Sequence, residues 1–418
     1  MRTQPLTKTI THFGLFLFAF SLPISHVPAQ FAIGIALLGW LGEGLVNKKW
    51  NIRWHPVLGA LVVYLSWNLI SSALSERPAH SLGAVIDNEW PFLIMVMLYW
   101  TVDDEALLQR VVYVFLLAST AAVLYALWQV VGGMELYRGT PLDPMGWGFY
   151  RAVGFYGFYL TFAALAMTVF FFASSFSVEF RKWPTVLLAG LSFLAVLGTF
   201  ARSMWLSFVA AIPLFAFTRG RKAGIVVTIV LLVVIVGGIL SVPALRYRAE
   251  SIVEPGQNET RLNLWKTALK IAEHNPILGV GEDNWDLVFE RYRVEGFYDS
   301  TVHPHNDYLT VLVSSGAPGF LAFLTMWVLS MVTGLKAANK TQRPIIRAVA
   351  LGATFSLLGL MIGGMFQNYY GTFINCLGWW FVIGLLLAAD KLRSPRSAVE
   401  NTIIATKSPT CLPTCPPE

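Results

Sequence analysis

The chain has 418 residues, of which 56% are hydrophobic and only 13% are charged, and its net charge is +6. Soluble domains carry about a quarter charged residues, so this composition excludes an ordinary soluble domain and indicates a polytopic membrane protein. The positive charge requires no nucleic acid, because basic residues of membrane proteins collect in cytoplasmic loops.

Apolar runs that fit transmembrane helices recur along the chain, since a span needs about 20 apolar residues. We predict an all-α polytopic membrane protein with about 12 transmembrane helices. The predicted spans are roughly 10–25, 29–46, 56–74, 88–102, 108–132, 150–175, 183–201, 203–218, 223–243, 308–335, 345–366 and 371–390. The first run lacks a small-residue cleavage site, so we interpret it as an uncleaved span rather than a signal peptide.

Only Ala201-Arg202-Ser203 separates the seventh predicted span from the eighth. If the two formed one helix, Arg202 would lie deep in lipid, where a charge costs several kcal/mol or more. A tight turn that places Arg202 near the membrane interface costs less. We therefore predict two helices with Arg202 at their junction.

The lysines and arginines predict the orientation of these spans. With the N-terminus inside, the cytoplasmic segments hold most of the basic residues, which agrees with the positive-inside rule. The short outer loops then hold only Arg77, Arg138, Arg151 and Arg202. Both termini are predicted to be cytoplasmic.

The predicted organisation is transmembrane helices 1–9 over 1–243, one large outer loop over 244–307, transmembrane helices 10–12 over 308–391, and a disordered cytoplasmic tail over 392–418. The sequence assigns no role to Cys411 and Cys415 in that tail.

The outer loop contains a predicted amphipathic helix over 260–274. Apolar residues from Leu262 to Ala272 repeat at helical spacing, and Asn275-Pro276 ends the helix. Arg261 lies in the first turn, where a cation gains nothing from the helix dipole. A surface arginine is the simpler interpretation of Arg261 taken alone, and a functional arginine is the alternative.

The same loop ends in His303-Pro304-His305-Asn306-Asp307-Tyr308. A metal site needs a third ligand, and none is evident beside the two histidines, so we predict no metal. A neutral imidazole can instead accept a proton from a sugar hydroxyl near neutral pH. We therefore predict a general base here, with Asn306 and Asp307 orienting it.

Several motifs occur on the predicted outer side. His305-Asn306 is followed after nine residues by Gly316-Ala317-Pro318-Gly319, and Arg202 is followed by Leu206. Arg261 opens a helix that ends near Asn275-Pro276, before Gly279 and Gly281. A fourth element runs from Arg151 to Gly157 and is followed by Phe158-Tyr159.

In these motifs the chain resembles the O-antigen ligase and O-antigen polymerase superfamily of bacterial envelope glycosyltransferases. The resemblance implies a glycosyltransferase of the so-called C type in the bacterial inner membrane, with its active site facing the periplasm. It implies a glycan donor on undecaprenyl pyrophosphate, a lipid A core acceptor in a ligase, surrounding membrane lipids, and no cofactor or nucleic acid. We predict that the catalytic residues are His305, Arg261 and Arg202, and that the substrate-binding residues are His303, Asn306, Arg151 and Tyr308.

In this mechanism arginines stabilise the charge on the departing pyrophosphate without a metal. His305 deprotonates the acceptor hydroxyl, and direct displacement inverts the anomeric configuration.

An O-antigen ligase is the first hypothesis. An O-antigen polymerase and a protein O-oligosaccharyltransferase are alternatives with the same type of donor. A lipid-linked sugar transporter is disfavoured, because a transporter should carry charges at mid-membrane on broken helices.

Overall fold

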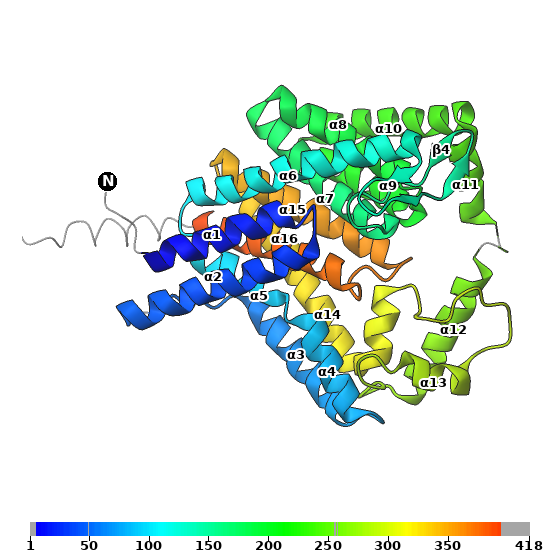
Figure 1. Ribbon diagram of the computed structural model, residues 1–418, viewed down its shortest axis with the longest axis horizontal. Coiled ribbons are helices and arrows are strands. Elements are labelled where there is room, and N and C mark those ends of the chain that lie inside the picture. Colours follow the sequence, from blue (N-terminus) through cyan, green and yellow to red (C-terminus); the bar gives the residue numbers. More distant parts are fainter. Residues whose placement is uncertain (1–5, 49, 255, 257, 394–418) are drawn as a thin grey trace, which may run out of the picture.

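The computed structural model describes residues 6–48, 50–254, 256 and 258–393, which form a bundle of helices (Figure 1). Arg2, Cys411, Cys415 and most of the predicted tail lie outside the described residues. The helices up to the outer loop are α1 (Leu6–Ser21), α2 (His26–Asn47), α3 (Pro56–Ala73), α4 (Pro78–Glu89), α5 (Phe92–Thr101), α6 (Glu105–Gly132), α7 (Tyr159–Phe180), α8 (Trp183–Gly198), α9 (Arg202–Phe217) and α10 (Arg221–Ser241). The later helices are α11 (Pro243–Val253), α12 (Glu259–His274), α13 (Trp285–Tyr292), α14 (Asp307–Asn339), α15 (Pro344–Gly364) and α16 (Phe373–Arg393).

The predicted fold class, an all-α polytopic membrane protein, is confirmed. Among the described residues, nine helical segments are long and apolar enough to cross a membrane, with α4 and α5 counted as one segment. Every predicted span corresponds to a helix, but α1, α8 and α9 have only 16 residues each. Such a helix measures about 24 Å, which is less than the roughly 30 Å of a hydrocarbon core. The count of twelve spans is therefore not confirmed.

Two predicted boundaries are wrong. The span predicted over 88–102 is interrupted, because α4 ends at Glu89 and α5 begins at Phe92 after Pro91, which has no N–H to donate. The span predicted over 150–175 begins only at Tyr159. Gly154 and Gly157 precede it with φ values of 58° and 73°, which a right-handed helix does not contain.

The segment between α6 and α7 forms two short antiparallel ribbons instead of continuing a helix. The strands are β1 (Met134–Glu135), β2 (Thr140–Pro141), β3 (Pro144–Gly146) and β4 (Phe149–Tyr150), with β1 pairing with β2 and β3 with β4. These ribbons lie at the same end of the bundle as α11, α12 and α13 (Figure 1). We call this the outer end.

The opposite end, where α1 begins and α16 ends, is the inner end (Figure 1). Three of its arginines are paired with carboxylates. Arg343 lies 2.9 Å from Glu105, and both Arg219 and Arg347 pair with Glu179. Its place in the cytoplasm remains the prediction of the positive-inside rule.

Helix α14 is broken near its start by the Gly-Ala-Pro-Gly motif. Gly316 has φ 63° and ψ −172°, which no residue inside an α-helix adopts. The carbonyl groups of Val313 and Ser314 would normally accept from residues 317 and 318. Ala317 donates elsewhere, and Pro318 has no N–H, so both carbonyl groups are left for other donors.

The turn segment 276–281, in the link between α12 and α13, fills this break. The amides of Val280 and Gly281 donate to the two carbonyl oxygens, each at 2.9 Å, and the Ala317 amide donates to Pro276 at 2.8 Å. A Cβ on Gly279 would lie 2.6 Å from the α14 backbone. Glycine is needed for so close an approach, and the glycine motifs therefore fasten the outer loop to α14.

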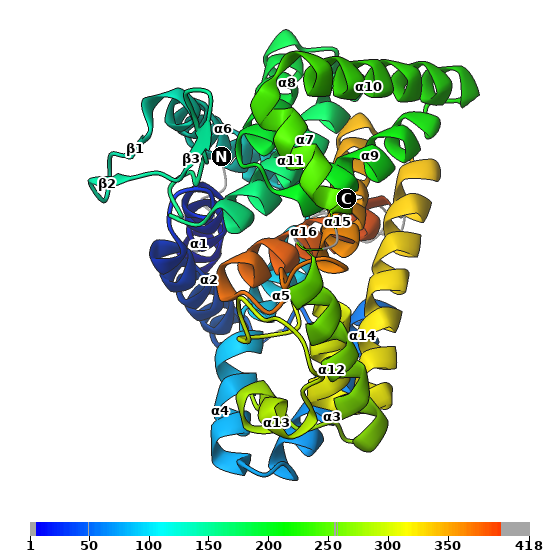
Figure 2. The same cartoon turned by 90° about the vertical axis from the view of Figure 1, so that its right-hand side faces the viewer.

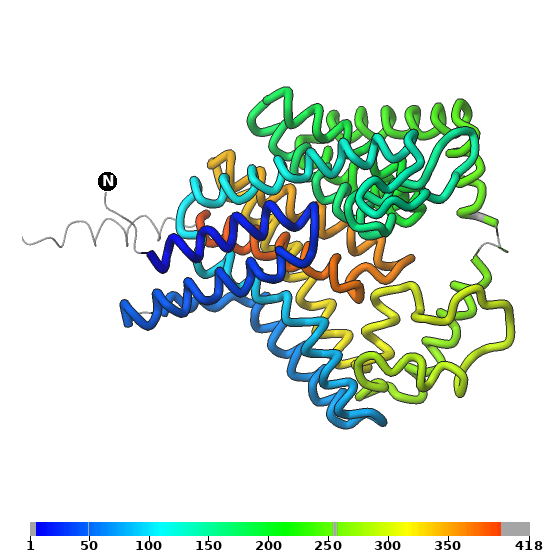
Figure 3. Tube along the Cα trace, in the orientation of Figure 1, coloured from blue at the N-terminus to red at the C-terminus, as the bar shows by residue number. Residues whose placement is uncertain are grey.

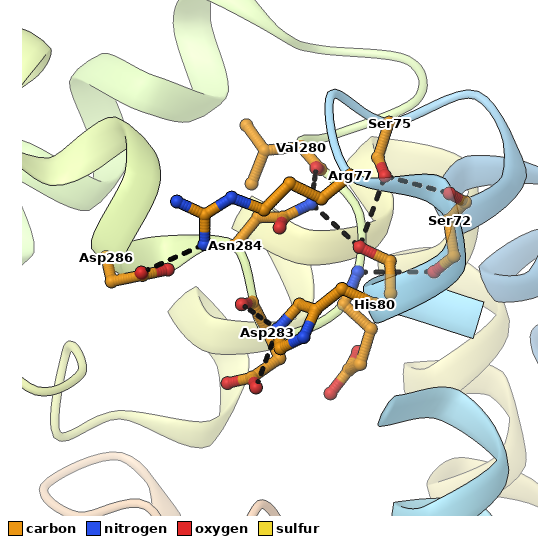
Figure 4. Close-up of polar contacts among 10 residues, drawn as sticks. Ser72, Ser75, Arg77, His80, Val280, Asp283, Asn284 and Asp286 are labelled. Carbon is orange, nitrogen blue, oxygen red and sulfur yellow. Dashed lines mark hydrogen bonds and ion pairs between the residues drawn. The ribbon is translucent and has the colours of Figure 1, made fainter. Parts of the chain in front are cut away.

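The outer loop also contacts the turn between α3 and α4 and the first residues of α4 (Figure 4). Asn284 Nδ2 donates to Ser81 Oγ at 2.8 Å and to the Val280 carbonyl at 2.8 Å. Two ion pairs close the same contact, His80 with Asp283 and Arg77 with Asp286, each at 3.1 Å. These contacts hold α12 and α13 in place beside the membrane helices.

The outer end consists of two groups of elements that face each other. Figure 2 shows α8, α10 and α11 on one side and α3, α4, α12 and α13 on the other. The Cα trace passes from α11 on the first side to α12 on the second (Figure 3). Side chains from both groups therefore have the opportunity to line one cavity.

Candidate functional site

A cavity of about 220 Å³ lies at the outer end, and both groups contribute to its lining through α11 and α12. Its lining residues come from α9, α11, α12 and the loop between α15 and α16. They are Arg202, Ser203, Leu206, Ile252, Asn258, Arg261, Leu262, Trp265 and Phe366. We call this cavity the arginine pocket, because the structure brings together in it both arginines that the sequence predicted to be catalytic.

Arg202 is the first residue of α9. The chain turns sharply before it, where Phe200 has φ 54° and α8 has already ended at Gly198. One guanidinium nitrogen of Arg202 donates to the Ser251 carbonyl and, at 3.2 Å, to Ser251 Oγ. Helix α11 thus orients Arg202, and the other N–H groups of Arg202 have no acceptor among the described residues.

Arg261 lies in the first turn of α12, as predicted. It makes no hydrogen bond or ion pair with any residue that the structure describes. Arg261 lines the cavity and is partly buried, so its N–H donors are available to a ligand in the cavity.

A further arginine, which the sequence did not single out, borders the arginine pocket. Arg248 of α11 is half-buried, and its Nε donates to the Phe200 carbonyl at 3.1 Å. Burial lowers the pKa of Arg248, and the positive charges of Arg151 and Arg261 lower it further. The sequence signal was ambiguous, because the nearby Arg246 has the same charge but pairs with Glu250 at 3.1 Å.

Arg151 lies beside this group but does not line the pocket. Its guanidinium is 3.3 Å from Asp143 and stacks 4.3 Å from the centre of the Tyr159 ring. The Arg151 guanidinium is therefore already engaged by two side chains of the protein, those of Asp143 and Tyr159. Its role in substrate binding remains a prediction.

The positive charge of the site comes from arginine side chains. Within the described residues, no group of three or more His, Cys, Asp or Glu side chains is arranged to hold a metal ion. None of the residues that line the arginine pocket is acidic. Planar guanidinium groups suit phosphate oxygens, because they offer parallel N–H donors.

His303 and His305 lie together in the link between α13 and α14. The His305 amide donates to His303 Nδ1 at 3.1 Å, and the two ring centroids are 4.2 Å apart. This contact accommodates the left-handed backbone of His305, whose φ is 52°. Burial lowers the pKa of His303 to about 4, and the charge of His305 contributes. His303 is therefore neutral near pH 7, and it supports the backbone of His305.

His305 is the predicted general base. Burial lowers its pKa, a hydrogen bond with Gln367 opposes that shift, and the charges of Arg261 and Asp299 act in opposite directions. Its Nδ1 lies 2.8 Å from Gln367 Oε1. A lowered pKa keeps the imidazole neutral, which is the form that can accept a proton.

His305 borders the arginine pocket through two aromatic residues. Trp265 lines the pocket, and its Nε1 donates to the Pro304 carbonyl at 3.0 Å. Phe366, which also lines the pocket, precedes Gln367. His305 thus lies next to residues that line the arginine pocket, although these segments are distant in the sequence.

The three residues after His305 bind the end of α15 and the loop that follows it. The contacts are Asn306 Nδ2 to the Met365 carbonyl at 2.9 Å, the Tyr370 amide to Asp307 Oδ1 at 2.8 Å, and Tyr308 Oη to the Met361 carbonyl at 2.9 Å. Asn306 also caps α14 by accepting from the Leu309 amide at 3.0 Å. The polar atoms of Asn306 and Tyr308, both predicted to bind substrate, are thus already bonded within the protein.

Residues 184–324 match a protein-family model described as O-antigen ligase. The resemblance to this family is confirmed over that range, which extends from α8 into α14 and contains Arg202, Arg248, Arg261 and His305. It excludes Arg151 and Gln367. A comparison with curated proteins gives no match. The family match supports a membrane enzyme of the ligase or polymerase type that acts on lipid-linked glycans.

Proposed function

We propose that this protein is an O-antigen ligase of the bacterial inner membrane. It transfers a glycan from undecaprenyl pyrophosphate to a sugar hydroxyl of the lipid A core, on the periplasmic side. The observation that carries the proposal is the arginine pocket, in which Arg202 and Arg261 have no carboxylate partner among the described residues and which His305 borders. Guanidinium groups suit a departing pyrophosphate, and a neutral imidazole suits the activation of a hydroxyl.

A second cavity favours a lipid-linked donor over a water-soluble one. It has a volume of about 230 Å³ and lies among α8, α9, α10 and α11. All the residues that line it are apolar, and it shares Leu206 and Ile252 with the arginine pocket. An isoprenoid chain in this cavity would place its pyrophosphate beside Arg202.

In the proposed reaction the acceptor hydroxyl gives its proton to His305 Nε2, and its oxygen bonds to the anomeric carbon of the donor. The bond between that carbon and the pyrophosphate oxygen breaks, and its electron pair stays on the leaving phosphate. Arg202 and Arg261 stabilise the negative charge that develops there. Attack from the face opposite the leaving group inverts the anomeric configuration.

The direct test is transfer by purified protein in proteoliposomes, with a defined undecaprenyl-pyrophosphate glycan and lipid A core. His305→Ala and Arg261→Ala are expected to abolish transfer, although both proteins still insert. Lys266→Ala is the matched control, since this cation lies on the same helix as Arg261 but is exposed and outside the pocket. Near-normal transfer by either site variant would contradict the proposal.

Excess EDTA is expected to leave transfer unchanged, because arginines supply the positive charge. Loss of transfer that Mg²⁺ restores would refute this mechanism.

Deletion of the gene separates a ligase from a polymerase. A ligase mutant accumulates polymer on the carrier lipid and shows only core on lipid A. Core that carries a single repeat unit would identify a polymerase instead.

A further inference from the structure

The loop between α15 and α16, residues 365–372, forms a wall of the site that neither the motifs nor the family match includes. Phe366 lines the arginine pocket. Gln367 is 7% exposed, and its Oε1 lies 2.8 Å from His305 Nδ1. A nearly buried amide is thus in direct contact with the ring of the proposed base.

With the amide oxygen of Gln367 toward the ring, one nitrogen of His305 is engaged and the other is left free. A carbonyl oxygen only accepts hydrogen bonds, so Nδ1 must carry the proton when it faces Gln367 Oε1. A neutral imidazole has one proton, and Nε2 is then the nitrogen that can accept another. The backbone of His305 is held separately through His303 Nδ1. The ring and the backbone are therefore each held by one contact.

The segment that carries His305 also holds the loop that carries Gln367. Asn306 Nδ2 donates to the Met365 carbonyl at 2.9 Å, and the Tyr370 amide donates to Asp307 at 2.8 Å. These two bonds bracket Gln367 in the sequence. They limit how far its amide can move away from the imidazole.

We propose that Gln367 is the positioning residue of His305, holding the ring through Nδ1 so that Nε2 is the proton acceptor. The inference rests on the proposed function, because it takes His305 as the base. Gln367 is neutral, so it orients the ring without adding charge. The charged or titratable groups near His305 are His303, Arg261 and Asp299.

The test compares two substitutions at Gln367 by steady-state transfer kinetics across pH. Gln367→Leu removes the acceptor at similar volume, and it is expected to lower kcat about 10- to 100-fold with KM for the donor little changed. Gln367→Glu keeps an acceptor but adds negative charge, which raises the pKa of the imidazole. Since transfer needs neutral His305, the fall in rate on acidification should begin at a pH higher by about one unit or more.

Asn368→Leu is the matched control, because it removes a neighbouring amide in the same loop whose Oδ1 accepts from the Gly371 amide at 3.2 Å. It should keep kcat near that of the unmodified protein and leave the acid limb in place. An equal loss of kcat in Asn368→Leu would reduce Gln367 to a general support of the loop and overturn the proposal.

Nitrogen NMR of histidine-labelled protein gives a readout besides activity, with the His305 signal assigned through His305→Gln. The Nδ1–H tautomer is expected in the unmodified protein, with a shift toward Nε2–H in Gln367→Leu. An Nε2–H tautomer in the unmodified protein would overturn the inference. If His305→Ala keeps transfer, the proposed function fails. If His305→Ala is inactive while both Gln367 variants behave normally, only the role of Gln367 fails.

Discussion

Arg343 and Arg219 at the inner end of the bundle differ from Arg202 and Arg261 at the outer end in what their guanidinium groups contact. At the inner end Arg343 pairs with Glu105, and Arg219 pairs with Glu179. At the outer end, within the described residues, Arg202 contacts only Ser251, and Arg261 contacts no acceptor at all. Arg343 and Arg219 thus each face a carboxylate, whereas Arg202 and Arg261 face none among the described residues.

The free-energy cost of holding unpaired, partly buried arginines together explains why this difference indicates function. Partly buried cations that repel one another destabilise a fold unless an anion compensates them. The outer cluster contains Arg202, Arg248 and Arg261 without an acidic side chain in the pocket lining. An anionic substrate group would remove that cost on binding. Paired arginines would gain nothing from the same ligand.

The largest expected effect comes from removing an unpaired arginine. Arg202→Ala should lower the transfer rate about 100- to 1,000-fold, as expected when one donor to a developing anion is lost. Arg343→Ala, which removes a paired arginine at the inner end, is the control and should keep the rate within about twofold per folded protein. Rates in proteoliposomes measure both, and equal losses would remove the distinction between the two ends.

Acidification tests His303 and His305. Among the described residues neither has an acidic partner at ion-pair distance, whereas His55 at the inner end lies 3.7 Å from Asp390. Burial lowers the pKa of His305 below 6.5, so transfer should stay constant near pH 7 and fall as pH drops through that lowered value. The fall should approach tenfold per pH unit. A rate that declines already above pH 7 would contradict a neutral base.

The burial of His303 also affects the thermal stability of the folded protein. The pKa of His303 is about 4 in the folded protein against an ordinary value of 6.5, so below pH 6.5 the unfolded chain binds a proton that the folded one does not. The thermal midpoint should therefore decrease between pH 6.5 and pH 4. His303→Gln should reduce this decrease, and an unchanged slope in that variant would contradict the burial of His303.

A moderate effect is expected for Arg248, which borders the pocket without lining it. Arg248→Ala should lower transfer about tenfold, which corresponds to about 1.4 kcal/mol of lost charge stabilisation. Arg246→Ala is the control, because Arg246 lies on the same helix but pairs with Glu250. A normal rate in Arg248→Ala would restrict the functional cluster to Arg202 and Arg261.

The smallest effect is expected at an exposed arginine of the outer end that does have a partner. Arg291 lies 2.8 Å from Glu76, and both side chains are 54% exposed. Arg291→Ala should leave the transfer rate and the thermal midpoint unchanged within error, since exposed ion pairs contribute little. A large loss of transfer would show that an arginine at the outer end is needed for transfer even when it is paired with a carboxylate.

Much of the architecture was predictable from hydropathy, because burial in lipid imposes long apolar runs that any sequence must display. The break at Arg202 was also predictable, since a charge inside a single long helix would be costly. The interruption at Pro91 and the late start of α7 at Tyr159 were missed. Their apolar residues continue past the helix ends, and only local backbone geometry stops the helices.

The residues of the candidate site also divide into those that the sequence indicated and those that it did not. Arg261 and His305 carried motif signals, but Arg248 looked no different from Arg246, and Gln367 lies in a short loop with no motif at all. Hydrogen bonding to a partner 62 residues away leaves no local pattern in the sequence. Only the packing of α14 against α15 brings Gln367 to the ring of His305.

By itself the sequence determined the membrane-helix class, the grouping of polar residues in 244–307, and the identity of Arg202, Arg261 and His305 as candidates, because hydropathy and motif spacing are local properties. The tertiary structure decided that Arg202 and Arg261 line one pocket without acidic partners, that Arg151 is bonded to the protein, and that Gln367 contacts His305. These are properties of distances between remote segments, which depend on how the helices pack.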